Sequence, residues 1–159
     1  MLSRIFPSKF DNAYRGSRLA IWIFVPVAFV HIGISLVGIL RPDGGAQSAD
    51  GIPLDSFPPL ASAAVVGVVA SLGAARLALG VFFVAAVFRY RTMIPLLYLL
   101  ILGLSLGNKL IDLFKPIARM PGVSSGGYVT WTLLGLVVLG LVLSLTGRGY
   151  SASRQLRTA

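Results

Sequence analysis

The feature that most constrains the fold is a set of four long apolar runs separated by short polar segments. The runs cover Leu19 to Leu40, Ala61 to Phe88, Thr92 to Phe114 and Tyr128 to Leu145. A helix of about 20 apolar residues crosses a hydrocarbon core of about 30 Å. Charged residues make up only 12% of the chain, too few for the surface of a soluble domain. The sequence therefore predicts an all-α fold, an integral membrane four-helix bundle.

Basic residues are distributed unevenly around these runs. Nine of the 14 Lys and Arg residues lie in the N-terminal segment, in the turn between the second and third runs, or in the C-terminal tail. Three lie in the other two connections. Positive charge stays in the cytoplasm, so both termini are expected there. The chain divides into a basic N-terminal segment, 1–18, a four-helix domain, 19–147, and a basic cytoplasmic tail, 148–159.

Composition excludes several classes of protein and site. The chain has no cysteine, which excludes disulfides, zinc knuckles and iron–sulfur clusters, and a single histidine excludes a bis-histidine haem within one chain. The net charge of +9 is explained by insertion topology, so we expect no nucleic-acid partner. Asp43, Asp50 and Asp55 fit no calcium loop and belong to a solvated outer loop. We expect no metal, no cofactor and no catalytic set.

Polar residues inside the runs are the candidate site. Arg76 in the second run has Gly73 and Gly80 about one turn away on either side, and His31 lies in the first run. One face of the third run is mostly polar, with its residues at helical spacing. This face consists of Tyr98, Ile101, Ser105, Asn108 and Asp112, and four of these five residues are polar. Since an unpaired arginine in a bilayer core costs about 2.5–3.5 kcal/mol, we expect a buried cluster of Arg76, Asn108, Asp112 and His31.

The same residues allow simpler interpretations, which stay open at this point. Arg76 fits a structural clasp between the second and third helices, a ligand, ion or proton site, or a contact to another subunit. His31 fits a hydrogen-bonded interior histidine, and Lys109 and Asp112 are spaced to pair with each other. Gly73, Gly80, Gly103 and Gly107 are candidates for close helix packing. For the last two, which form a GxxxG pattern, homodimerisation is the alternative.

The stretches Leu72 to Phe83 and Leu104 to Asp112 resemble a family of small four-helix bacterial membrane proteins of unknown function, and distantly the DoxX-like proteins. The resemblance covers about the middle third of the chain. Gly107-Asn108-Lys109 stands where that family has a Gly-Arg pair. The resemblance implies four helices in a bacterial inner membrane and brings no activity, cofactor or catalytic residue.

Three classes of function follow. The expectation we place first is an accessory or scaffold subunit of a membrane complex, with the lipid bilayer and other membrane subunits or a second copy as partners. The second is a carrier or binding protein for a small lipophile, quinone or ion that uses the Arg76 cluster. An enzyme is the class least expected, because no nucleophile set, metal-ligand pair or phosphate loop is present.

Overall fold

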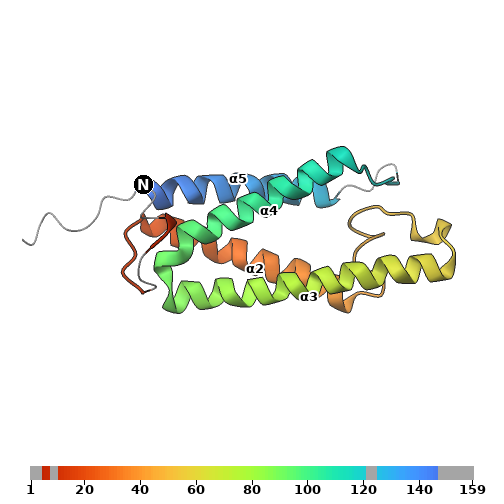
Figure 1. The fold of residues 1–159 in the computed structure, drawn as a ribbon, viewed down its shortest axis with the longest axis horizontal. Coiled ribbons are helices and arrows are strands. Elements are labelled where there is room, and N and C mark those ends of the chain that lie inside the picture. The colour runs from red at the N-terminus through yellow and green to blue at the C-terminus, as the bar shows by residue number, and fades with distance from the viewer. Residues whose placement is uncertain (1–4, 8–10, 121–124, 147–159) are drawn as a thin grey trace, which may run out of the picture.

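The computed structural model describes residues 5–7, 11–120 and 125–146, with side chains from 128 onward in the last helix. It contains four long helices, named α2 (Arg18–Leu40), α3 (Pro59–Arg89), α4 (Ile94–Phe114) and α5 (Ser125–Thr146) (Figure 1). Two short 3-10 turns, η1 (Leu54–Ser56) and η2 (Arg91–Met93), precede α3 and α4. No strand occurs among these residues. All four spans are long and apolar enough to cross a membrane, so the predicted all-α, multi-pass class is confirmed.

Local sequence explains where the helices begin. The Ser17 hydroxyl accepts a hydrogen bond from the Leu19 amide at 3.3 Å and caps α2. Prolines stand in the first turn of α3 and of α4, where their missing N–H has no helical partner to lose. Pro26 lies inside α2, which continues unbroken to Leu40. The predicted boundaries lie within three residues of those observed, and the tail 148–159 lies outside the described residues.

The four helices do not pack as a closed ring. Helix α2 lies against α3 on one side and α5 on the other, and α4 packs on α5. Helices α3 and α4 are joined by a tight turn, yet they make few contacts with each other. Figure 1 shows α4 leaving the turn and crossing toward α5, while α3 stays beside α2. Helices α3 and α4 are therefore consecutive in the sequence but separate along most of their length.

An aromatic cluster fixes the part of the bundle where all four helices meet. The rings of Phe24 and Phe83 pack edge to face with centroids 5.7 Å apart, and those of Phe24 and Tyr98 at 5.0 Å. All three side chains are fully buried. The Tyr98 hydroxyl donates a 2.7 Å hydrogen bond to the Ala20 carbonyl oxygen. This hydrogen bond orients the Tyr98 ring, which belongs to α4, toward the start of α2.

The bundle has two ends of different construction. At the terminal end, residues 11–18, the α3–α4 turn and the end of α5 come together. There the Ser17 amide donates to the Leu143 carbonyl at 3.3 Å, and the Thr92 amide donates to the Asp11 carbonyl at 3.2 Å. The loop end holds connection 41–58 and segment 115–120. The Met120 amide donates to the Gly51 carbonyl at 2.8 Å and links these two segments.

Candidate functional site

Three polar residues from three helices lie at similar depths in the bundle. Counting at 1.5 Å per residue, Arg76 and His31 lie about 20 Å, and Ser105 about 17 Å, from the terminal end of their own helix. When the terminal ends of the helices are placed at one surface of a hydrocarbon core of about 30 Å, these residues lie about 10 Å below the opposite surface, on the loop side. Side chains of α3 lean toward its N-terminus, which is the loop end. The guanidinium of Arg76 is therefore directed toward the nearer surface.

Arg76 is exposed along the side of α3. Over the described part of the chain, the structure shows no hydrogen bond or ion pair to its guanidinium. His31 on α2 and Asp50 in connection 41–58 lie within electrostatic range of Arg76. Gly80, one turn from Arg76, packs against Ile32 of α2, so the α3 backbone approaches α2 closely at this depth.

The imidazole ring of His31 has a hydrogen-bond partner in its own helix and a packing partner in α3. Its Nδ1 lies 3.0 Å from the carbonyl oxygen of Val27, one turn earlier in α2. Its ring packs edge to face on Phe83, with centroids 5.7 Å apart. The next polar residue along the same face, Ser35, is fully buried and donates to the His31 carbonyl at 2.7 Å. His31 is therefore a half-buried histidine held between α2 and α3.

The polar stripe of α4 divides into two parts. Tyr98 and Ile101 are buried in the bundle, whereas Asn108 is exposed and Ser105 and Asp112 are half-buried. No hydrogen bond to the Asn108 side chain is seen within the described ranges. The polar half of the stripe therefore lies outside the buried core that holds Tyr98 and Ile101.

The predicted cluster of Arg76, Asn108, Asp112 and His31 is not assembled as a closed network. Asp112 pairs instead with Arg119, with 3.4 Å between Oδ1 and Nη2. Lys109 does not pair with Asp112 either, because its ammonium lies over the Trp131 ring of α5, 5.1 Å from the centroid. The physical reason is the packing of α4 on α5, which carries Asn108 and Asp112 away from α3. Within the expected cluster, His31 lies within electrostatic range of Arg76.

The four candidate packing glycines behave as two pairs. A β-carbon at Gly73 would meet the Ser35 carbonyl oxygen at 3.1 Å, and a β-carbon at Gly80 would overlap the side chain of Ile32. These two positions hold α3 against α2. A β-carbon at Gly103 or Gly107 would have no neighbour within 4 Å. The GxxxG pattern of α4 therefore does not pack within this bundle, contrary to the packing expected from sequence.

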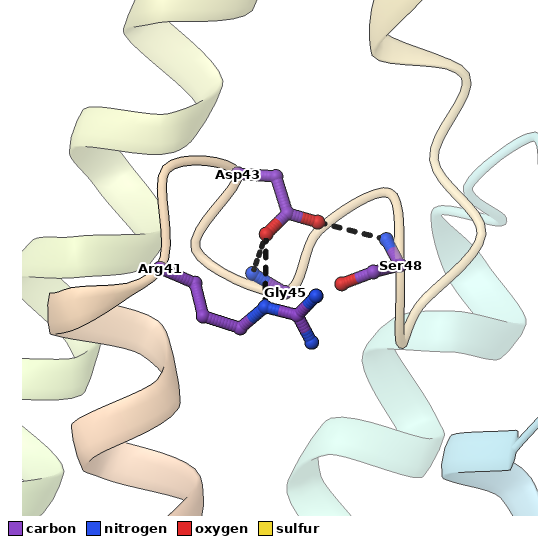
Figure 2. A network of polar contacts seen from close by, with 4 residues as sticks. All are labelled: Arg41, Asp43, Gly45 and Ser48. Atoms are coloured by element: carbon purple, nitrogen blue, oxygen red, sulfur yellow. Dashed lines mark hydrogen bonds and ion pairs between the residues drawn. The ribbon is translucent and has the colours of Figure 1, made fainter.

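Connection 41–58 is a folded cap rather than an extended loop. Figure 2 shows the carboxylate of Asp43 receiving the amides of Gly45 at 3.0 Å and Ser48 at 2.9 Å, with Arg41 beside it. Gly44 and Gly45 have φ of +60° and +80°, a conformation that glycine adopts freely. Hydrogen bonds from Ser48 lower the pKa of Asp43 to about 2, so this carboxylate stays charged. Ala46, at the centre of the cap, is fully buried.

Asp50 is a neighbour of the site that the sequence analysis did not assign to it. Its carboxylate is within electrostatic range of Arg119, Arg76 and Asp112. Burial raises the pKa of Asp50, partly offset by the two arginines. Its position depends on how connection 41–58 folds back over the bundle, and no local spacing in the sequence signals that. Asp43 had a usable signal, since Asp-Gly-Gly is a common turn sequence.

Among the described residues, no group of three or more His, Asp or Glu side chains could hold a metal ion. No protein-family model matches the chain, and no curated protein and no solved structure shows significant similarity to it. Fold and site together define a multi-pass helical membrane protein with an exposed arginine inside a membrane span.

Proposed function

We propose that this protein is an accessory subunit of a larger membrane complex and that its partner packs against the N-terminal part of α3. The observation that carries the proposal is the length of this helix. Helix α3 has 31 residues, whereas α2 beside it has 23. At 1.5 Å per residue α3 is about 46 Å long. It is thus far longer than a hydrocarbon core of about 30 Å.

Tilting does not absorb the excess length. Membrane helices tilt by up to about 40°, at which a helix of this length still spans about 35 Å along the membrane normal. The N-terminal turns of α3 therefore project beyond the core at the loop end. Figure 1 shows α3 continuing past the end of α2.

The projecting turns are apolar, which is unusual for a segment facing water. Leu60 is 88% exposed, and the neighbouring Ala61, Ala63 and Ala64 are also exposed. Ser62 is the polar side chain of this stretch, and its hydroxyl is bonded to the Pro59 carbonyl. An exposed apolar patch at the edge of a membrane protein is typical of a contact with another subunit. The open sides of Gly103 and Gly107 on α4 offer a further surface for close helix contact.

We further propose that the protein resides in a bacterial inner membrane with the terminal end in the cytoplasm. The support is the excess of Lys and Arg in the segments at that end. The exposed aromatic residues Trp22 near one end and Tyr128 near the other fit the two interfacial belts. Because the chain has no cysteine, Ser48→Cys and Arg89→Cys can report topology directly. A membrane-impermeant thiol reagent added to intact cells should label the Ser48→Cys protein and leave the Arg89→Cys protein unlabelled.

The subunit proposal is tested on the tagged full chain extracted from its native membrane in mild detergent. Native mass spectrometry should show a foreign membrane subunit in fixed stoichiometry. Leu60→Gln should release that subunit, because it places an amide in an apolar contact. Leu113→Gln is the matched control, an exposed leucine at the same end of the bundle but on α4. A particle that holds this chain alone, or equal partner recovery with Leu60→Gln, would contradict the proposal.

A further inference from the structure

We propose that the side of the bundle between α3 and α4 binds the anionic headgroup of a membrane amphiphile, with its phosphate or carboxylate held by Arg76. This binding site goes beyond the proposed subunit role and stands on a different part of the molecule. It rests on four observations: the exposed and unpaired guanidinium of Arg76, its depth, the polar groups of α4 at a similar depth, and the absence of an ion pair between Arg76 and the described acids.

The first observation is that Arg76 is a cation inside a membrane span without an ion pair in the described structure. Leaving such a residue among lipid tails is unfavourable, and membrane arginines face partners or water-filled regions. Helix α4, the natural neighbour, has turned away toward α5. The lateral side of Arg76 is therefore open to molecules that diffuse within the bilayer.

The second observation is depth. With the terminal end of α3 placed at one surface of a core of about 30 Å, Arg76 lies about 10 Å below the surface on the loop side. Its side chain extends toward that surface, because side chains of α3 lean toward its N-terminus. A long arginine side chain brings its charged head toward the interface in this way. The guanidinium then meets the headgroup level of lipids in the leaflet on the loop side.

The third observation concerns the groups around this opening. Ser105 and Asn108 on α4 supply a hydroxyl and an amide about 17 Å and 21 Å from the start of their helix, on either side of the depth of Arg76. Both can donate to a headgroup oxygen. The exposed Leu72 of α3 and Leu104 of α4 supply apolar surface at neighbouring turns. A headgroup with attached acyl chains satisfies both kinds of surface at once.

The fourth observation is that the nearby acids do not occupy Arg76. Asp112 is already paired with Arg119 at 3.4 Å. Asp50 lies within electrostatic range of Arg76, but no ion pair joins them. A guanidinium binds phosphate or carboxylate through two parallel hydrogen bonds, which favours an anionic oxygen pair as its partner.

The test uses the full chain in detergent and native mass spectrometry with four probes. These are dioleoyl-phosphatidylglycerol, dioleoyl-phosphatidylcholine, oleate and inorganic phosphate. We expect phosphatidylglycerol or oleate to bind at least about tenfold more tightly than phosphatidylcholine, because Arg76 favours a net anionic headgroup. Retention of phosphatidylglycerol alone identifies a phospholipid as the source of the anion. Retention of oleate identifies a carboxylate amphiphile.

Three variants assign the binding to Arg76. Arg76→Gln should lower retention about tenfold, and Arg76→Lys should lie between this variant and the wild type, because lysine keeps the charge without the planar fork. Lys115→Gln is the matched control, since it removes one positive charge near the loop end and should retain the lipid. If Arg76→Gln does not fold, the comparison of Arg76→Lys with the wild type decides.

Specific results would overturn the inference. Equal binding of phosphatidylcholine and phosphatidylglycerol would do so, as would equal retention by the wild type and Arg76→Gln. Binding of inorganic phosphate as strong as that of either amphiphile would remove the role of the acyl chains. A foreign protein helix that cross-links to position 76 in native membranes would show a protein contact in place of the amphiphile. None of these results depends on whether the Leu60 patch binds a subunit.

Discussion

The phenol ring of Tyr98 lies directly against the backbone of Gly140, so that a β-carbon at position 140 would overlap the ring. This contact joins α4 to α5. The same tyrosine reaches α2 through its hydrogen bond to Ala20. Tyr98 thus fixes the start of α4 against α2 and α5, and the rest of α4 follows α5 away from α3. The opening beside Arg76 is a consequence of this packing.

Gly140→Ala should therefore destabilise the bundle. The added methyl group cannot be accommodated without moving the Tyr98 ring, which is fully buried and hydrogen-bonded. Overpacking of this kind costs about 1–3 kcal/mol. The thermal midpoint of the purified protein in detergent, followed by circular dichroism, should fall by several degrees.

Gly135→Ala provides the control for that measurement. It makes the same chemical change in the same helix, at a position with no neighbour within 4 Å of the added carbon. Its midpoint should equal or exceed that of the wild type, because alanine favours a helix more than glycine does. Equal losses for the two variants would show that the contact between Tyr98 and Gly140 has no special importance.

Gly73→Ala should separate α3 from α2. Its β-carbon would lie 3.1 Å from the Ser35 carbonyl oxygen and 3.4 Å from the Gly38 carbonyl carbon, both in the α2 backbone. Backbone atoms cannot rotate aside, so the two helices must shift. The expected loss is about 1–3 kcal/mol, read as a lower midpoint of unfolding. Gly67→Ala, on the same helix with open space around it, should cause no loss. A stable Gly73→Ala protein would argue against the close approach of these helices.

Asp43 should make stability depend on pH in the acid range. Its pKa in the folded protein is about 2, below the ordinary value of 3.8. The charged carboxylate therefore stabilises the cap fully above about pH 4, and the contribution disappears as the pH falls toward 2. The midpoint of unfolding should be lower for Asp43→Asn than for the wild type at pH 6.

This difference between Asp43→Asn and the wild type should shrink steadily as the pH is lowered from 4 toward 2. Arg41→Gln should cost less than Asp43→Asn at pH 6, because its ion pair at 3.6 Å is half exposed and such pairs contribute little. A difference that is constant between pH 6 and pH 2 would show that the charge of Asp43 does not stabilise the cap.

The all-helical fold could be predicted because the signal is repeated along the whole chain. Apolar runs of membrane-spanning length admit few other structures, since unpaired backbone groups are very costly in lipid. The helical spacing of residues in α4 also predicted part of its inward face, since Tyr98 and Ile101 are buried. Periodicity reports which residues share a face. It does not report which helix that face meets.

The site was harder to predict for this reason. The predicted contact of Arg76 with Asn108 and Asp112 required that helices adjacent in the sequence pack along their full length. The packing of Tyr98 on Gly140 instead joins α4 to α5, a pairing set by shape at one residue. Asp112 then forms its ion pair with Arg119. The folding of connection 41–58 over the bundle brings Asp50 within electrostatic range of Arg76 and Arg119. These contacts depend on tertiary packing, which no local spacing encodes.

The central claim is that α3 and α4 separate beside Arg76, and disulfide cross-linking in native membranes tests it most directly. The chain has no cysteine, so pairs can be introduced without background. Ile32→Cys with Gly80→Cys joins α2 to α3 at a close contact and should cross-link rapidly with a copper oxidant. Arg76→Cys with Asn108→Cys should remain uncross-linked under the same conditions. Cross-linking of the second pair as fast as the first would show a closed α3–α4 pair and contradict this separation.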